Sequence, residues 1–318
     1  MTARSPRAPL PSTHAPLSRR GVLRAGTAGG LAALLAGTTL LTGCGDGEIV
    51  SALSPSRFIS FGDGLSDLGQ STSGTRYTIN DGTVNTWADR LASRYGKTIT
   101  AQTAGGLGYA QGHASTGALP RSLITQIDVF MASQTLAVND VVLINLPMAD
   151  VLSAMAAVKA NTLTEAAALA QVDAVGRAHV VQIKRLIAAG AKYVLVLGVY
   201  HLGTSPFAIA QGQVALATSL SQKLNDAFKT DAVNLGANLL FVDAAFLVNR
   251  NVLTGSAYGF TNINTAICTT ADASTCNSGT LLSGATAAQY VFADGIHLTP
   301  NCNQQLGDYA YTQLASRW

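Results

Sequence analysis

The stretch RFISFGDGLSDLG, residues 57–69, decides how the folded part of this 318-residue chain begins. Its first five residues, Arg57–Phe61, form an apolar run that ends at the turn residues Gly62-Asp63-Gly64. Such a run, bounded by turn residues, predicts a strand that is buried in a sheet. Polar residues then follow at the carboxyl end of the strand, which is where open α/β sheets bind their ligands.

Strand-like and helix-like patterns alternate along the rest of the chain. Three further apolar runs predict strands, at Val141–Leu146, Tyr193–Val199 and Leu239–Val242. Helical patterns are clearest at Thr86–Tyr95, Ser122–Ala132, Leu163–Ala189 and Gln213–Leu235. This alternation predicts a parallel sheet with helices on both faces. We therefore expect one α/β domain, residues 57–318, built as a three-layer, doubly wound parallel sheet.

The composition excludes two broad classes of protein. Hydrophobic residues make up 48% of the chain, which is too many for a disordered protein. The formal charge of +3 is too small for a dedicated nucleic-acid binder. Five of the 20 basic residues lie in residues 1–43, which hold no acid, and removing them leaves 15 basic against 17 acidic residues. The chain beyond residue 43 therefore carries a slight excess of acidic residues, and we expect no nucleic-acid partner.

The first 43 residues have the order of an export signal. Arg19-Arg20 precede an apolar run at residues 26–41, and Leu41-Thr42-Gly43-Cys44 follows it. The run is diluted by Gly and Thr and is shorter than the ~20 apolar residues of a membrane span. The paired arginines resemble the twin-arginine type, which implies the twin-arginine export machinery as a partner. Residues 41–44 resemble a bacterial lipobox, which implies lipidation of Cys44.

These features predict where the protein resides. We expect residues 1–43 to be a removed signal peptide and residues 44–56 to be a lipidated tether. The protein would then be exported and held at the bacterial cell envelope, in the periplasm or on the surface, with the membrane contacted through its lipid anchor.

The remaining cysteines fit an oxidising compartment. Cys268 and Cys276 bracket a polar segment, which predicts a small disulfide loop, and Cys302 is left as a buried thiol or an alternative partner. No second Cys or His stands at the spacing of a zinc site. The Gly clusters at 62–64 and 105–108 lack the Lys and the Ser or Thr of a phosphate loop. We therefore expect neither a metal nor a cofactor.

Residues 61–69, FGDGLSDLG, resemble the opening block of the GDSL, or SGNH, ester hydrolases. Five further blocks resemble the same family and follow in its order, at residues 108–114, 146–150, 202–206, 258–262 and 292–300. Together the blocks extend the resemblance over residues 57–318. It implies a flavodoxin-like SGNH hydrolase fold and an ester, lipid or glycan ligand. The loop at 202–206 resembles the branch of lecithinase/hemolysin-like phospholipases.

The resemblance also implies a role for each matching position. His297 is the expected base, and Asp294, three residues earlier, orients its ring. The nucleophile position is Gly64, which has no side chain. Backbone N–H groups of Gly64 and of the block containing Gly112 and His113 are expected to stabilise the oxyanion. Ala149 occupies the position of the oxyanion-stabilising Asn.

These departures leave several functions open. Losing one oxyanion donor costs about 3 kcal/mol of transition-state stabilisation, and losing a triad serine costs roughly a millionfold in rate. The chain is therefore expected to be either a weakly active acylhydrolase or a non-catalytic envelope protein that binds lipid, acyl or glycan ligands. A third hypothesis is a water nucleophile activated by His297 or His113.

Other residues are weaker candidates for the chemistry. Ser66 is an alternative nucleophile, although side chains two residues apart do not share a face. His113 could also serve as a base beside Asp63 or pair with His297 at a metal. His179 is expected at a surface or boundary position, and His201 in a structural hydrogen bond.

Overall fold

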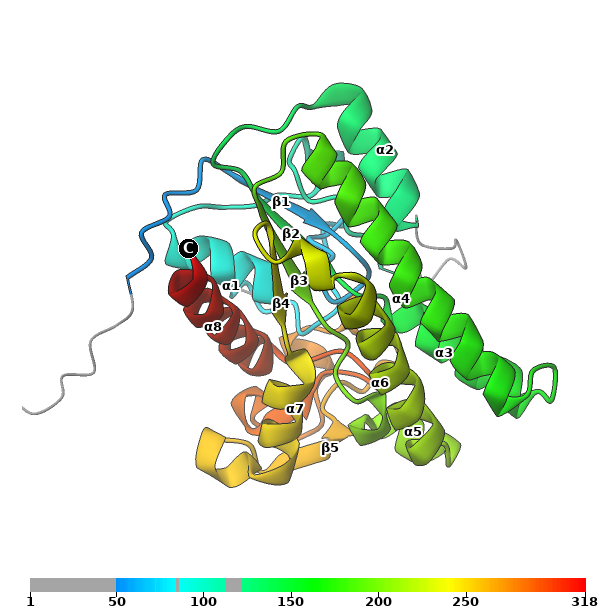
Figure 1. Cartoon of the computed structure of the whole chain (residues 1–318). Coiled ribbons are helices and arrows are strands. Elements are labelled where there is room, and N and C mark those ends of the chain that lie inside the picture. The colour runs from blue at the N-terminus through cyan, green and yellow to red at the C-terminus, as the bar shows by residue number, and fades with distance from the viewer. Residues whose placement is uncertain (1–49, 72, 84–85, 113–121) are drawn as a thin grey trace, which may run out of the picture. The chain divides into compact units, whose positions relative to one another are not determined.

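Four parallel strands, in the order β1-β2-β3-β4, form the main sheet of the fold (Figure 1). They are β1 Phe58–Phe61, β2 Val141–Asn145, β3 Tyr193–Leu197 and β4 Leu239–Val242. The computed structural model describes residues 50–71, 73–83, 86–112 and 122–318. The four strands are the four apolar runs of the sequence. β1 and β2 are buried along their whole length, because helices cover both of their faces.

A fifth segment lies along the other side of β1. The N–H of Ser60 donates to the carbonyl of Leu107 at 3.0 Å, and the N–H of Tyr109 donates back to Ser60. Gly108 forms a parallel bridge with Ser60. The chain therefore passes from β1 to this segment on one side and then to β2 on the other. That reversal makes the sheet doubly wound and places β1 in its interior.

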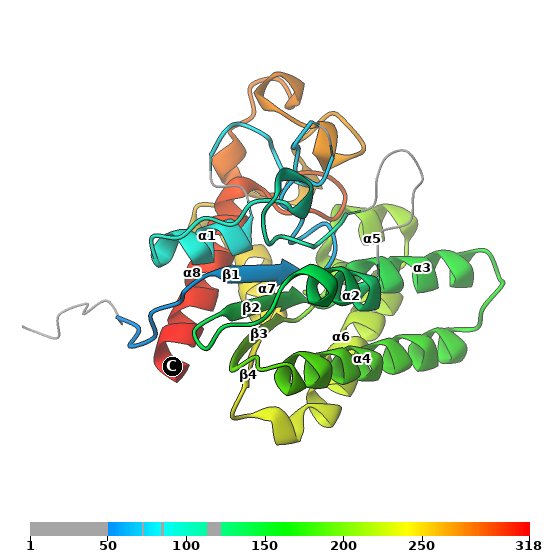
Figure 2. The same ribbon diagram turned by 90° about the horizontal axis from the view of Figure 1, so that it is seen from above.

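Helices cover both faces of the sheet. Figures 1 and 2 show α1 Trp87–Arg94 and α8 Pro300–Arg317 packed together on one face. The other face carries α2 Leu123–Ser133, α4 Glu165–Ala188 and α6 Val214–Asp231. The remaining helices are α3 Met148–Lys159, which packs on α4 and α6, the short α5 Pro206–Gln211, and α7 Ala244–Leu253, which packs on α8. The three-layer α/β fold expected from the sequence is confirmed.

Side-chain caps set where most of these helices begin. The side chain of the residue before the first turn accepts a backbone N–H of that turn, which would otherwise lack a partner. The caps of this kind are Thr86, Ser122, Thr164, Ser205, Asp243 and Thr299. α3 begins after Pro147, which offers no such side chain. The family block at residues 146–150 therefore runs from the end of β2 directly into a helix.

A second, two-stranded sheet carries the chain toward its last loop. Its parallel strands are β5 Asn262–Ala266 and β6 Tyr290–Phe292. β6 ends two residues before Asp294, and α8 begins three residues after His297. The segment that holds both residues is thus fixed at each end.

The residues before β1 lie against the folded unit. The Ser51 hydroxyl and the Leu53 N–H both donate to the carbonyl of Trp318, and the Ser56 N–H donates to Asn139. Leu53 is buried. Residues 51–56, expected in the tether, therefore pack on the domain. The signal segment and Cys44 lie outside the described residues. Within the described ranges, no helix combines the length and apolar character that crossing a membrane requires.

Gly62 gives a test of the turn after β1. Its φ of +137° suits glycine, and an added Cβ would lie 1.9 Å from Oδ1 of Asn145. Gly190 also has a positive φ, +110°, but a Cβ there would meet nothing within 4 Å. We expect Gly190→Ala to cost about 1 kcal/mol of unfolding free energy and Gly62→Ala to cost about 1–3 kcal/mol more, as measured by urea unfolding. Equal losses would contradict this account of the turn.

Candidate active site

Asp63 joins the turn after β1 to the start of α3. Its carboxylate accepts hydrogen bonds from Asn145 Nδ2 at 2.7 Å, the Met148 N–H at 2.6 Å and the Leu65 N–H at 3.1 Å. Asp63 is buried, so these donors replace the water that the charge has lost. The ends of β1 and β2 are thereby fixed beside each other.

The chain turns at Gly62, where other groups complete this junction. The side-chain amide of Gln126 accepts from the Gly62 N–H at 2.8 Å and donates to the Gly62 carbonyl at 2.7 Å. α2 is thereby tied to the turn. Asn145 donates through the same Nδ2 to Asp63 and to the Leu146 carbonyl. Its amide N–H groups are therefore used within the junction.

Asp294 and His297 form a buried hydrogen-bonded pair. The Nδ1 of His297 donates to Oδ2 of Asp294 at 2.8 Å. The other carboxylate oxygen, Oδ1, accepts the backbone N–H groups of Ile296 at 2.9 Å and His297 at 2.7 Å. The three-residue spacing thus closes a turn in which the carboxylate holds both the backbone and the ring of the histidine. The ring also lies against Tyr77, with centroids 4.9 Å apart.

The pair is electrostatically coupled. Burial by itself would raise the pKa of Asp294, but the charge of His297 and the hydrogen bonds from His297 and Ile296 lower it to about 2. Burial opposes protonation of His297, yet the charge and hydrogen bond of Asp294 outweigh it and raise the pKa of His297. Asp294 therefore stays ionised, and Nδ1 stays the donor. Only Nε2 is left to exchange a proton with a ligand.

The disulfide loop supports this pair. Cys268 and Cys276 form a disulfide, as their spacing indicated. Between them, the N–H of Ala273 donates to Oδ2 of Asp294 at 2.9 Å. The loop therefore supplies a fourth hydrogen bond to the carboxylate, a role that the sequence did not reveal. Cys302 is a buried free thiol, and burial raises its pKa to about 12.

Gly64 lies directly beside the free nitrogen of His297. A Cβ built on Gly64 would be 2.8 Å from Nε2 and 3.2 Å from Cγ of Tyr77. A side chain at this position would therefore meet Nε2, which is the relation that a nucleophile has to its base. Gly64 supplies no such group.

The neighbouring serines do not fill this place. Ser66 is completely buried, and its Oγ accepts a hydrogen bond from Nε1 of Trp87 at 2.9 Å. Ser60 is completely buried within β1. Ser66 is thus held on the side of α1, behind the turn.

The residues predicted to stabilise the oxyanion differ in their positions and contacts. The N–H of Gly112 donates to Oδ2 of Asp67 at 2.7 Å, and Gly112 packs so closely on Tyr77 that a Cβ would lie 1.9 Å from its ring. Ala149 lies in the first turn of α3 and lines the cavity beside the turn, without an amide to offer. His113 lies outside the described residues, so its part in the site stays a prediction.

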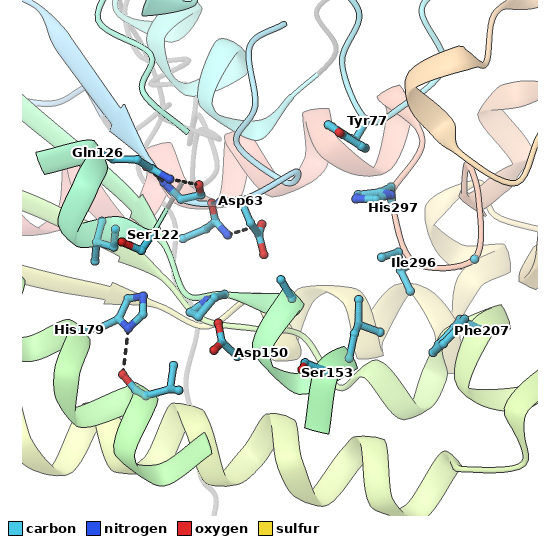
Figure 3. Close-up of a pocket in the computed structure, with 18 of the residues that line it drawn as sticks. Asp63, Tyr77, Ser122, Gln126, Asp150, Ser153, His179, Phe207, Ile296 and His297 are labelled. Atoms are coloured by element: carbon cyan, nitrogen blue, oxygen red, sulfur yellow. Dashed lines mark hydrogen bonds between the residues drawn. The ribbon is translucent and has the colours of Figure 1, made fainter. Parts of the chain in front are cut away.

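A cavity of about 870 Å³ lies between the turn after β1, the helices α2, α3 and α4, and the segment that holds Asp294 and His297 (Figure 3). His297, Asp294, Asp63 and Tyr77 line one part of it. Its other walls are largely apolar and include Leu123, Ile124, Leu152, Val175, Phe207 and Ile296. Its size suits a ligand with an acyl chain.

The sequence did not show that several residues line the cavity. Tyr77, Gln126 and Asn145 carried no recognisable signal. His179 is half-buried, in line with the surface or boundary position expected of it, but the sequence did not show that it lines the cavity from α4. Helical periodicity shows which face of α4 packs inward, but it does not show that part of the helix borders an open space. His201 makes the structural hydrogen bond expected of it, with Asn249 at 2.7 Å.

The pair gives a test by titration. The charge of Asp294 raises the pKa of His297, whereas burial of the ring lowers it. Asp294→Asn removes that charge, so we expect the pKa of His297 to fall, as followed by NMR of its ring protons. Asp272 also raises the pKa of His297, but through its charge alone, so Asp272→Asn should lower it less. Equal shifts in the two variants would contradict the special role of Asp294.

Comparison with known proteins gives the family. The sequence matches the model of the GDSL-like lipase/acylhydrolase family over residues 58–310. No match was found among curated proteins. Among solved structures, the chain is similar to a lipolytic G-D-S-L protein from Veillonella parvula DSM 2008, with 12% identity, a TM-score of 0.44, and coverage of 82% of this chain and 99% of that one.

Two further structures show the same coverage, 82% of this chain and 99% of theirs. One is a carbohydrate acetylesterase from Sinorhizobium meliloti, with 17% identity and a TM-score of 0.43. The other is a phospholipase A1 from Streptomyces albidoflavus NA297, with 16% identity and a TM-score of 0.38. Likeness at this level says nothing about the substrate. The match to the family model covers most of the sequence, and the chain belongs to the GDSL-like lipase/acylhydrolase family.

Proposed function

We propose that the chain is an exported acylhydrolase that binds a carboxylic ester in the cavity and hydrolyses it with His297 and Asp294. One observation carries this proposal. Nε2 of His297 lies 2.8 Å from the place of a Gly64 Cβ, while Asp294 holds the opposite nitrogen of the ring at 2.8 Å. A base is therefore oriented toward the position from which the family attacks its ester.

The nucleophile in this proposal is water, because Gly64 has no hydroxyl and Ser66 is bonded to Trp87. The water oxygen forms a bond to the ester carbonyl carbon and gives its proton to Nε2 of His297. The tetrahedral intermediate then breaks its bond to the alcohol oxygen, which takes the proton from His297. The products are a carboxylic acid and an alcohol, and the base is restored.

This route is slow for a physical reason. With Ala149 in place of an amide, the oxyanion lacks a donor that is worth about 3 kcal/mol. Asn145 does not replace it, because its amide N–H groups are used by Asp63 and the Leu146 carbonyl. The backbone N–H of Gly64 remains the proposed donor.

The second candidate function is ligand binding without turnover. Gly64 and Ala149 favour it, because both side chains that would contact the reacting carbonyl are missing while the cavity remains. The protein would then hold a lipid, acyl or glycan ligand at the cell envelope.

The proposal of export rests on the N-terminal sequence. Arg19-Arg20 and the apolar run fit the twin-arginine machinery, and Leu41-Thr42-Gly43-Cys44 fits lipidation at Cys44. The disulfide loop supports an oxidising compartment, since such bonds persist there. The domain would lie in the periplasm or on the surface, anchored through Cys44.

Hydrolysis of short-chain p-nitrophenyl esters by the purified chain tests the mechanism. We expect slow hydrolysis that His297→Ala abolishes. Its rate should rise with pH through the pKa of His297, which is raised above 6.5, because the base must be neutral. Gly64→Ser should increase the rate by at least about a hundredfold, since it restores a serine nucleophile.

Gly64→Ala is the matched control, because it adds the same Cβ without the hydroxyl. It should abolish hydrolysis, since the added carbon stands where the water must approach Nε2. Hydrolysis that survives His297→Ala would refute the mechanism. No hydrolysis by the unmodified chain, with a gain only in Gly64→Ser, would refute the water mechanism and favour the binding function instead.

Replacing Cys44 tests the anchor. In the bacterial host, Cys44→Ser should move the protein from the membrane fraction to the soluble fraction and stop incorporation of radiolabelled fatty acid. The change lies outside the cavity, so ligand binding should be unaffected. Unchanged membrane association would contradict lipidation at this residue.

A further inference from the structure

The cavity has a second polar region, away from His297. It consists of Ser122 before α2, Asp150 and Ser153 on α3, and His179 on α4, and we call it the polar wall. Figure 3 shows His179 and Ser122 on the opposite side of the cavity from His297, with Asp150 between the two sides. The proposed hydrolysis uses none of these four side chains.

His179 offers a hydrogen-bond acceptor to the cavity. Its Nδ1 lies 2.9 Å from the carbonyl oxygen of Val175. A carbonyl only accepts, so Nδ1 carries the proton and Nε2 keeps a free lone pair. Burial lowers the pKa of His179, which keeps the ring neutral. Nε2 of the neutral ring therefore accepts a hydrogen bond from a ligand, and the ring carries no charge that would attract an anion.

The charges around the cavity are mostly negative. Four carboxylates line it, from Asp63, Asp150, Asp272 and Asp294, and His297 pairs with Asp294. Among the described residues that line the cavity, none is Lys or Arg. Burial and then the charge of Asp63 raise the pKa of Asp150, as expected of two carboxylates facing one poorly solvated space.

These groups select a kind of ligand. Asp150 and His179 both accept hydrogen bonds, and the two serine hydroxyls can donate or accept. Hydroxyl groups match this set, because each of them can donate. A phosphate is disfavoured, because it carries negative charge and acceptor oxygens, and the wall already holds a carboxylate and hydrogen-bond acceptors. The apolar surroundings screen the repulsion between the charges poorly.

We propose that the polar wall binds an uncharged group bearing several hydroxyls, such as glycerol or a sugar, and excludes phosphate-bearing esters. The proposal rests on the proposed function in one respect, that the cavity holds the ester. The apolar walls then take the hydrocarbon chain, and the hydroxyl-bearing group lies against Asp150 and His179.

Binding of non-hydrolysable ethers to the purified chain tests the proposal separately from hydrolysis. The probes are 1-octylglycerol, octyl glucoside and octyl phosphate, titrated calorimetrically as monomers at pH 8. We expect at least one neutral ether to bind at least about tenfold more tightly than octyl phosphate, since like charges disfavour the anion. The two neutral ethers distinguish glycerol from a sugar. Octyl phosphate binding as tightly as both would overturn the proposal.

Two cavity variants and one control variant locate the effect. Asp150→Asn should reduce the discrimination against octyl phosphate severalfold, whereas Asp128→Asn, an exposed carboxylate on α2, should leave it unchanged. His179→Phe should weaken the neutral ethers and leave octanol binding unchanged. A discrimination that neither cavity variant alters would overturn the assignment to the polar wall. Absence of ester hydrolysis would not affect these results, because ethers are not cleaved.

Discussion

The buried carboxylate of Asp63 is the constraint on which the site depends. β1 and β2 end side by side, and their following segments must diverge into different layers of the fold. Asp63 holds them together through Leu65, Asn145 and Met148. With that junction fixed, Asp63, directly before Gly64, and Ala149 border the same cavity. The hydrogen bonds also satisfy a charge that burial would otherwise make costly.

The opposite side of the site is organised in the same way. Asp294 gathers four N–H donors from three residues, and one of them comes from the loop closed by Cys268 and Cys276. Two buried carboxylates therefore fix the two halves of the site. Neither depends on a side chain at position 64, which explains physically how the His297 geometry is maintained beside Gly64.

Much of the fold could be predicted because its signals are local. The apolar runs gave all four strands to within two residues, and capping residues such as Thr86 and Ser122 mark helix starts. α3 was missed because it starts after Pro147 without a capping side chain. Tyr77 was missed because its segment has no periodicity, and its position against His297 comes from contacts far apart in the sequence. The cavity beside His179 is likewise a product of packing between α2, α3 and α4.

The burial of Ser66 against Trp87 has a consequence for the detection of this protein by chemical labelling. Fluorophosphonate reagents identify serine hydrolases by forming a bond to an activated hydroxyl. Gly64 offers none, and the hydroxyl two residues later is buried and hydrogen-bonded. We therefore expect an inventory of esterases based on such labelling to leave this chain out, even if His297 activates water.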